Sequence, residues 1–344
     1  MPDSFDTIAL FGAAGQIGSA LLDALLSPSV PDYHPRVKVF YQRSESDKYS
    51  ERVREHDRVE RVEVRDFQDV ERLAEALRGV DAVVSALNGP AISAQYALLD
   101  AADKAGVKRF LPSEFGHHHL YRAPGDKGAR LHPMWDDKER FKEHLQLHPA
   151  MMSGRMSFTF VGCGDFCSSL SLGLTRHVIR VADDQPRETY WCAYAQQPPP
   201  ERYVLPCVGD GDAEADFTKI SDLAQYVAAL LSRPSTSHNA SLSFISDTLS
   251  QHRMADLLRS ASGRPVDVDA FSEADAHGYI ARPDEAPERC GASSGFPVEF
   301  WMMVKLAQGQ GRFRRHPSQV HNALFPEVKP TPFADWLAQT VRAT

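Results

Sequence analysis

Ile8-Ala-Leu-Phe-Gly12-Ala-Ala-Gly15-Gln-Ile-Gly18-Ser-Ala-Leu-Leu22 stands almost at the start of the chain and decides its fold. Its first part, Thr7 to Phe11, is an apolar run typical of a buried parallel strand. Leucines recur over residues 21–26 and form one face of a helix that can pack back on the sheet. Three glycines spaced GxxGxxG lie between the two. The segment therefore predicts a β-strand, a glycine turn and an α-helix.

Each glycine of this turn has a separate physical role. Gly12 allows the tight turn, Gly15 lets the backbone approach a diphosphate, and Gly18 lets helix and strand touch. Backbone N–H groups and the helix dipole at the start of the helix favour an anion. The turn predicts a nucleotide site, with a plain glycine-rich turn as the alternative. We expect the cofactor contacts to come from Gly12, Ala14, Gly15, Gln16, Ile17 and Gly18.

Composition limits the class of protein. With 344 residues, 42% of them hydrophobic and 24% charged, the chain is long enough for a full globular core. A net charge of -8 without a long basic run argues against nucleic acid as the main partner. The acidic N-terminus has no signal-peptide pattern, no run of 18 apolar residues exists, and the five cysteines are scattered. We expect a cytoplasmic protein with reduced thiols that binds no membrane.

Further strands and helices alternate after the glycine turn. The expected strands are Val37–Tyr41, Arg61–Val64, Ala82–Ala86 and Lys108–Leu111, and the helices between them include Val70–Leu77 and Gln95–Ala105. This alternation predicts an α/β fold with a doubly wound parallel sheet, the Rossmann architecture. We expect residues 1–165 to form the nucleotide domain, with its sheet completed by later segments, and residues 166–344 to form a smaller α/β substrate lobe. In that second part we expect a helix over Thr218–Leu231, capped by neighbouring serine and aspartate, a strand over Ser243–Ile245 and a helix over Gln251–Ala261.

The residues after the second strand indicate which dinucleotide binds. An acidic side chain there would accept hydrogen bonds from the ribose 2′-hydroxyl and repel a 2′-phosphate. The chain instead has Arg43, followed by Lys48, and an arginine can form a forked contact with a phosphate. The pattern favours NADP(H) over NAD(H), with a solvated loop charge as the alternative. Leu87 and Asn88 follow the fourth strand at the ligand-binding edge, so we expect cofactor contacts there too, unless they form an ordinary turn.

Several segments together resemble a known family. The glycine turn, Arg43 and Arg109-Phe-Leu-Pro-Ser-Glu-Phe-Gly116 look like the isoflavone reductase-like branch of the NmrA-like, atypical short-chain dehydrogenases. Met134-Trp-Asp-Asp-Lys138-Glu-Arg-Phe-Lys142 resembles the family's helix with a catalytic lysine. The likeness covers about residues 5 to 340, and its further segments are Phe158–Val161, Gly209–Gly211, Ser221–Ala224, Phe296–Pro297 and Leu324–Lys329.

The resemblance implies an activity and a site. It implies NADPH-dependent reduction of an aromatic, often phenylpropanoid-derived, small molecule by a monomer or homodimer, with Lys138 beside the cofactor as general acid/base. An ammonium there would stabilise or protonate the oxyanion that hydride addition or ether opening produces. In the alternative, Lys138 is one of several solvated charges that follow Asp136 and Asp137. The resemblance also implies a substrate pocket with Ser113, Phe115, Phe166 and Lys142.

The chain departs from the family pattern at two places. Lys142 stands where the family usually has an arginine, and the segment between Ser169 and Gly209 is longer than the family norm. Both bear on the substrate more than on the cofactor. Two other functions stay open: a redox-neutral isomerase or rearrangement enzyme on the same scaffold, and a non-catalytic regulator that senses NADP(H). Retention of Lys138 argues against the regulator.

Two clusters of distinctive residues have ordinary explanations as well. The histidines at 117, 118, 119 and 132 lack the spacing of a helical zinc site, so we expect a solvated or pocket-rim loop and no metal. An aromatic and methionine-rich stretch predicts a packed core, with a cleft wall as the alternative. That stretch comprises Phe296, Phe300, Trp301, Met302, Met303 and Phe313.

Overall fold

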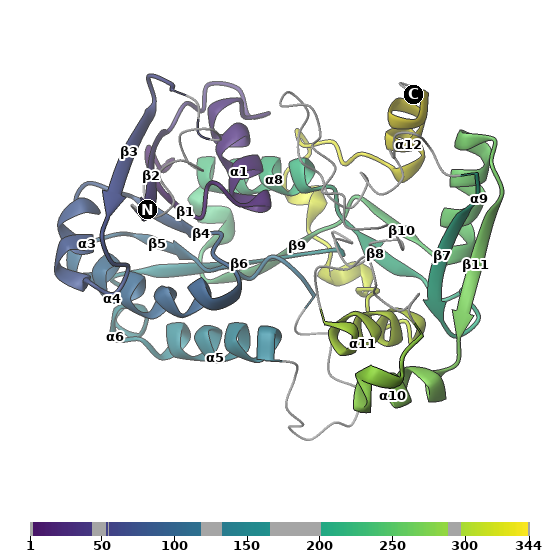
Figure 1. Cartoon of the computed structure of the whole chain (residues 1–344). Helices are drawn as coiled ribbons and strands as arrows, with labels where there is room; N and C mark the ends of the chain where they lie inside the picture. Colours follow the sequence, from purple (N-terminus) through teal and green to yellow (C-terminus); the bar gives the residue numbers. More distant parts are fainter. Residues whose placement is uncertain are drawn as a thin grey trace.

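A computed structural model describes residues 3–42, 53, 55–117, 133–165, 201–287 and 297–342. Its main feature is a seven-stranded sheet in the order β3-β2-β1-β4-β5-β6-β9, in which every pairing is parallel (Figure 1). The strands are β1 (Thr7–Phe11), β2 (Arg36–Gln42), β3 (Val59–Val64), β4 (Ala82–Ser85), β5 (Arg109–Leu111), β6 (Ser157–Cys163) and β9 (Ala240–Phe244). The predicted α/β fold with a doubly wound parallel sheet is confirmed.

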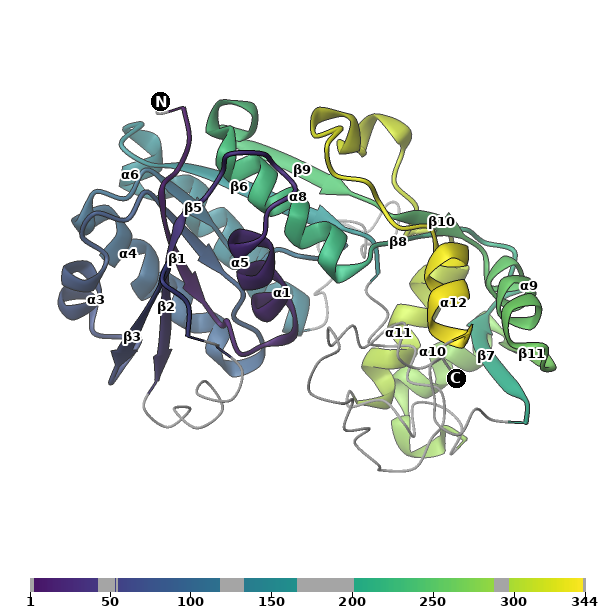
Figure 2. The same cartoon turned by 90° about the horizontal axis from the view of Figure 1, so that it is seen from above.

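Helices cover both faces of this sheet. On one face lie α1 (Gln16–Leu26) and α8 (Ile220–Ser232), which contact each other. On the other lie α3 (Val70–Ala76), α4 (Gln95–Ala105), α5 (Pro133–Leu147) and α6 (Pro149–Met152), as Figures 1 and 2 show. Side chains of β1 alternate between the faces, because Ile8 and Leu10 join the core with α1 and α8 while Ala9 and Phe11 join the other core. The strand is therefore buried on both sides, as its apolar run predicts.

The strand order reverses between β1 and β4. In open parallel sheets, ligands bind beyond the carboxyl ends of the strands at such a reversal. The glycine turn follows β1, and Leu87 and Asn88 follow β4, so both predicted cofactor segments flank this switch point.

Two elements of the large sheet come from the second half of the chain. β9 pairs with β6 through residues 240–244, and α8 lies beside α1. The predicted cap of α8 was wrong: the helix begins at Ile220, and its N-cap, Lys219, makes no side-chain cap. Asp222 in the first turn instead accepts hydrogen bonds from Ser246 Oγ (2.7 Å) and Thr331 Oγ1 (3.0 Å), which fasten the helix to later segments.

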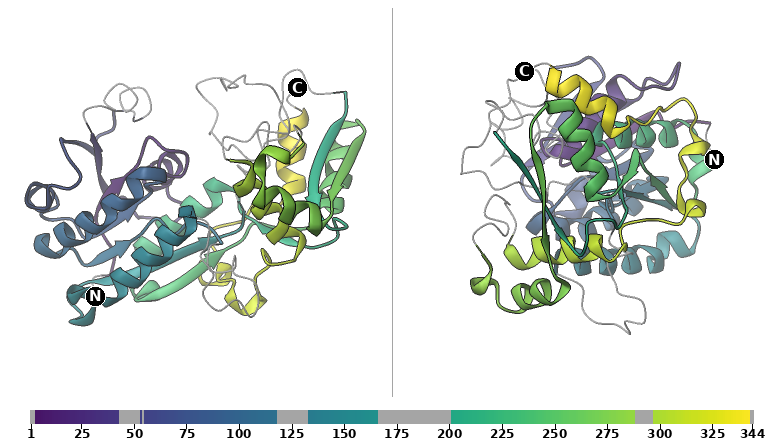
Figure 3. Two further views of the ribbon diagram at one scale, coloured as in Figure 1. Left: turned by 60° about the horizontal axis from the view of Figure 1, so that its bottom comes forward. Right: turned by 90° about the vertical axis from the view of Figure 1, so that its right-hand side faces the viewer.

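The smaller part contains two two-stranded sheets and four helices of the described chain. β7 (Tyr203–Val208) pairs in parallel with β11 (Val266–Phe271), and β8 (Ala215–Phe217) pairs antiparallel with β10 (Asp247–Leu249). Figure 3 shows this part from two further sides, with its helices α9 (Gln251–Ser262), α10 (Glu273–Ala281), α11 (Val298–Gly309) and α12 (Phe333–Arg342). Phe300, Trp301, Met302 and Phe313 are buried in its cores, as packing predicts. Phe296 lies outside the described residues.

The end of β6 joins the two parts. The backbone N–H of Asp165 donates to the carbonyl of Asp216 (2.8 Å), and a Cβ on Gly164 would lie 2.5 Å from the carbonyl carbon of Phe217. Only a glycine permits so close an approach of two backbones. The division at residue 165 stays a prediction.

No helix in the described part of the chain is long and apolar enough to cross a membrane.

Candidate functional site

The glycine turn has the shape that its spacing predicts. Gly12 adopts φ +83°, and a Cβ there would lie 2.7 Å from the carbonyl oxygen of Ala86 after β4. A Cβ on Gly18 would lie 2.0 Å from the carbonyl oxygen of Gly12, so helix α1 touches the turn directly. Gly15 N–H donates to that same oxygen (2.9 Å) and Gly15 forms the N-cap of α1. Strand, turn and helix are therefore held close together by backbone contacts that no larger residue would allow.

The start of α1 suits an anion. No described side chain caps this helix end, and its first turn contains no acidic residue. A glycine N-cap leaves the backbone accessible, and the dipole places partial positive charge there. These residues fit the diphosphate of a dinucleotide. Gln16, Ile17 and Gly18 form the first turn, while Ala14 is buried just before it.

Not all predicted cofactor residues fall in the described ranges. Arg43 and Lys48 lie outside them, directly beyond β2, which ends at Gln42. Leu87 is buried and Asn88 is exposed at the start of a short 3-10 helix, η2 (Gly89–Ala94). Their contacts with a cofactor stay predictions.

The turn after β5 is fixed in place by α4. The N–H of Ser113 donates to Oε1 of Gln95 (2.8 Å), and Gln95 is fully buried at the start of α4. Ser113, Glu114 and Phe115 are all buried, with Phe115 in the core shared by α1 and α8. Three of the four predicted pocket residues are described, and their contact with a substrate stays a prediction; Phe166 lies outside the described residues.

Lys138 lies on α5, which contacts both α4 and η2. Burial lowers the pKa of its amine, and the charge of Glu114 and the nearby thiol of Cys163 partly oppose that effect. No hydrogen bond or ion pair within 4.0 Å engages this amine among the described residues. Glu114 follows β5 and Cys163 ends β6, so the amine lies at the carboxyl edge of the sheet, the edge that carries the glycine turn. An amine in this environment exchanges its proton more readily than a solvated lysine.

The charges of α5 divide between two sides. Asp136 pairs with Arg140 (2.7 Å), whose side chain is 56% exposed, whereas that of Lys142 is only 19% exposed. Lys142 Nζ lies 2.7 Å from Oε1 of Glu139 and 3.7 Å from Oε2 of Glu114. Lys138 and Lys142 are one turn apart and share the side that meets Glu114. The alternative of Lys138 as a fully solvated charge does not fit this arrangement.

A buried polar cluster lies next to this site. Arg315 donates from Nη1 to Nδ1 of His117 (2.8 Å) and to the carbonyl of Cys163 (2.7 Å), and from Nη2 to the carbonyl of Gly116 (3.0 Å). The ring of His117 stacks on Phe313 at 4.7 Å. The expectation of a solvated or pocket-rim position was wrong for His117, which is fully buried because Arg315 and Phe313 enclose it. His118, His119 and His132 lie outside the described residues.

Sequence reasoning missed Glu114 and Arg315. Glu114 had a usable signal, because it stands inside the Pro112–Gly116 string on which the resemblance depends most. Arg315 had none, since it is one of three arginines at 312, 314 and 315 that look alike in sequence. In the described ranges no cluster of three His, Cys, Asp or Glu side chains could hold a metal ion.

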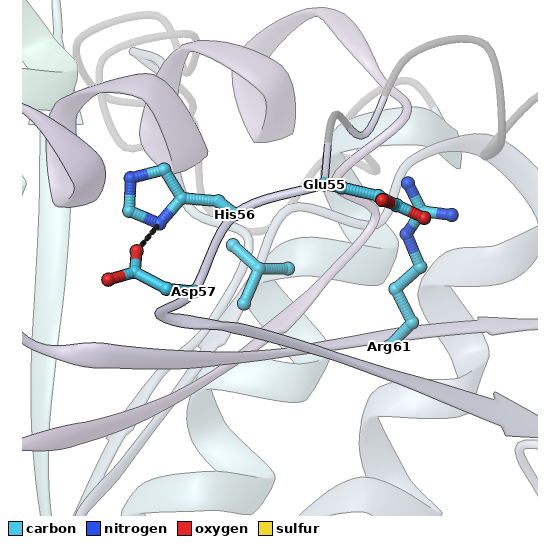
Figure 4. A pocket seen from close by; sticks show the side chains of 5 residues that line it. Glu55, His56, Asp57 and Arg61 are labelled. Carbon is cyan, nitrogen blue, oxygen red and sulfur yellow. Dashed lines mark ion pairs between the residues drawn. The ribbon is translucent and has the colours of Figure 1, made fainter.

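A separate hollow of about 550 Å³ lies elsewhere on the molecule. It is lined by Glu55, His56, Asp57, Val59 and Arg61, with an ion pair between His56 and Asp57 (2.7 Å; Figure 4). These residues precede or begin β3, at the amino ends of the strands, opposite to the edge of the glycine turn. The hollow therefore takes no part in the candidate site.

Comparison with known proteins identifies the family of this chain. The model of the NmrA-like family matches residues 4–336. The chain belongs to the NmrA-like family. This NmrA-like chain is 24% identical to phenylcoumaran benzylic ether reductase TP7 of Nicotiana tabacum, in an alignment 344 positions long that covers 97% of this chain and 98% of the relative. It is 28% identical to pinoresinol reductase 1 of Arabidopsis thaliana over 239 residues, covering 67% of this chain and 65% of the relative.

Solved structures share the fold of this NmrA-like protein. The structure of AtPrR2 with NADP+ and (+)-pinoresinol superposes with a TM-score of 0.71 at 20% identity, over 99% of this chain and 100% of the other. Within the family, the chain is thus similar at low identity, but along its whole length, to the isoflavone reductase-like branch. The resemblance inferred from sequence is confirmed.

Proposed function

We propose that this protein is an NADPH-dependent reductase of an aromatic or conjugated small molecule, with Lys138 as general acid/base. The observation that carries the proposal is the half-buried amine of Lys138 at the edge of the sheet that also bears the glycine turn. A nucleotide-binding turn alone would serve a sensor equally well. A lysine with a lowered pKa at the same edge of the sheet is typical of a catalytic group.

NADPH, when bound, would supply the hydride of the reaction, which carries two electrons. The N-terminal end of α1 with Gly12, Gly15 and Gly18 would hold its diphosphate. Arg43 would pair with the 2′-phosphate. Leu87 and Asn88, which follow β4 at the switch point, would border the nicotinamide half.

Lys138 would donate the proton that the reaction consumes. When an electrophilic carbon next to an aromatic ring accepts a hydride, its bond to an ether oxygen breaks and the electron pair of that bond stays on the oxygen. The ammonium of Lys138 donates its proton to this oxygen, so the leaving group departs as a neutral phenol. The neutral amine then regains a proton from water. The sum is one hydride and one proton added across a carbon–oxygen bond.

The substrate class follows from the relatives and from this chemistry. The relatives include a phenylcoumaran benzylic ether reductase, matched along 97% of this chain, and a pinoresinol reductase, matched along 67% of it. We propose that this chain reduces a benzylic ether or a similarly conjugated aromatic compound in secondary metabolism. The ring of the buried Phe160 has its centroid 5.9 Å from Nζ of Lys142, so an apolar side chain lies beside this lysine.

A turnover experiment tests the proposal. Purified protein is incubated with NADPH and a small panel of benzylic ethers, and loss of NADPH is followed together with product by mass spectrometry. We expect Lys138→Met to lower kcat by about 10²- to 10⁴-fold with unchanged affinity for NADPH, whereas Lys104→Met, at a surface pair with Glu71, should change neither. Full turnover by Lys138→Met would refute the role of Lys138. Product formed without NADPH loss would indicate the redox-neutral enzyme, and tight NADPH binding without any product would indicate the regulator.

A binding experiment tests the cofactor. We expect Arg43→Ala to weaken NADPH by about tenfold or more and NADH very little, since a charged contact to phosphate contributes about 1.5–3 kcal/mol. Calorimetric titration of both nucleotides measures the difference. Equal losses for the two nucleotides would contradict the assignment to the 2′-phosphate.

A further inference from the structure

Glu114 lies beside Lys142 of α5, one helical turn from Lys138. Its side chain is only 5% exposed, and its Oε2 lies 3.7 Å from Nζ of Lys142. Lys138 lies one helical turn before Lys142, so both ammonium groups emerge toward the turn that follows β5. Among the charged groups that act on Lys138, Glu114 has the largest effect, and it raises the pKa of the amine.

Titratable groups from three elements lie near Lys138. The turn after β5 contributes Glu114, the end of β6 contributes the thiol of Cys163, and α5 itself contributes Lys142 and Glu139. Burial raises the pKa of Cys163 to about 12, so this thiol stays neutral and uncharged at ordinary pH. Glu114 is therefore the carboxylate that counters the burial of the amine.

Glu114 interacts with Lys142 through charge alone. The 3.7 Å between Lys142 and Glu114 exceeds the donor–acceptor range of a hydrogen bond, so the contact is one of charge and does not form a proton relay. Lys142 is at the same time held by Glu139 at 2.7 Å. A lysine offers a point charge to a carboxylate, whereas an arginine would engage both of its oxygens. Lys142 thus leaves more of the Glu114 charge to act on Lys138.

We propose that Glu114 is a positioning residue whose buried carboxylate, beside Lys142 and one helical turn from Lys138, favours the protonated form of Lys138, and that the charge of Lys142 weakens this effect. The inference rests on the proposed function, in which Lys138 is the acid. Glu114 touches neither substrate nor cofactor in this scheme. It acts through the lysine.

Competitive labelling of amines with acetic anhydride across pH tests the inference without turnover. Mass spectrometry of the peptide that holds Lys138 gives the pKa of that amine in the folded protein. We expect Glu114→Gln to lower the measured value by about one pH unit, because an opposite charge near a lysine raises its pKa by about that much or more. Glu143→Gln removes an equal charge from an exposed position of α5 and should leave the value unchanged.

Lys142→Met provides a second, opposite test. Removal of a neighbouring positive charge should raise the pKa of Lys138, and this variant keeps the buried carboxylate in place should Glu114→Gln fail to fold by circular dichroism. An unchanged value in Glu114→Gln, or in Lys142→Met where only that variant folds, would overturn the inference. Labelling does not require the protein to turn over a substrate. This failure is therefore distinct from failure of the proposed function, which full turnover by Lys138→Met would reveal.

Discussion

Nη1 of Arg315 lies 2.8 Å from Nδ1 of His117 in the interior, where a loop of the smaller part meets the turn after β5. A guanidinium has only donors, so Nδ1 must be the acceptor and the imidazole is neutral, with its proton on Nε2 toward the carbonyl of Asp216 (3.4 Å). The same guanidinium binds the carbonyls of Gly116 and Cys163. Arg315 therefore fixes the two segments that border Lys138.

Removal of Arg315 should destabilise the whole protein. Arg315→Met leaves two buried carbonyls and a ring nitrogen without this donor, so we expect a loss of about 3 kcal/mol or more in the free energy of unfolding. Arg314→Met is the matched control, because Arg314 is 55% exposed and pairs with Glu214 at the surface, where a pair contributes about 0–1 kcal/mol. Urea unfolding measures both. Equal effects would show that the buried contacts of Arg315 add nothing to stability.

The pH dependence of turnover should reflect Lys138. Burial lowers the pKa of its amine below the ordinary lysine value of 10.5. Because the protonated amine is the active form, kcat/KM should be high below that lowered pKa and fall as pH rises through it, at a pH below 10.5. The thiol of Cys163 cannot produce this limb, since its pKa is raised to about 12. A profile that stays flat up to pH 10.5 would argue against Lys138 as the acid.

The three glycines should differ in their response to alanine. Gly18→Ala places a Cβ 2.0 Å from the carbonyl oxygen of Gly12 and should unfold the turn, with a large drop in Tm. Gly15→Ala places its Cβ at 3.1 Å from that oxygen, so the protein should stay folded while its affinity for NADPH falls. Thermal melting and nucleotide titration separate the two effects. Normal NADPH affinity in Gly15→Ala would mean that the backbone there does not approach the cofactor closely.

Arg109 should matter for stability and not for the chemistry. It is fully buried at the start of β5, where Nε donates to Ser157 Oγ (2.6 Å) and Nη1 to Thr159 Oγ1 (2.8 Å) and to the carbonyl of Ser237 (3.0 Å). Arg109→Met removes these buried hydrogen bonds from a charged donor, so we expect a loss of about 3 kcal/mol in the free energy of unfolding. The folded fraction should turn over substrate with an unchanged pH profile. An altered profile would place Arg109 in the electrostatics of the site.

Local sequence patterns predicted the elements of the larger part well, and long-range packing explains what they missed. The helix expected over Gln95–Ala105 has those bounds in the structure, since the left-handed Gly106 ends it (φ +77°). The strand β7 was not expected, because Tyr203–Val208 contains a proline and pairs only with the distant β11. The burial of His117 depends on Arg315, almost 200 residues away in the chain, and no local pattern reports such a contact.

The site could be predicted in kind but not in its electrostatics. The glycine spacing and the position of Lys138 followed from the sequence and from the family resemblance. The carboxylate that faces Lys138 did not, because α5 and the turn after β5 meet only in the folded sheet. The sequence also does not distinguish Arg140, which pairs with Asp136 at the surface, from the half-buried Lys138, because both stand in a run of alternating charges.

The insertion of β9 and α8 into the larger part has a consequence for how the protein is made. On the ribosome, the segment up to Cys163 emerges with β6 as an open edge and with the apolar side of α1 uncovered, because their partners are still unsynthesised. Folding of this part has to wait until Phe244 has left the exit tunnel. A nascent chain that stalls before that point would be a substrate for chaperones rather than a working nucleotide-binding unit.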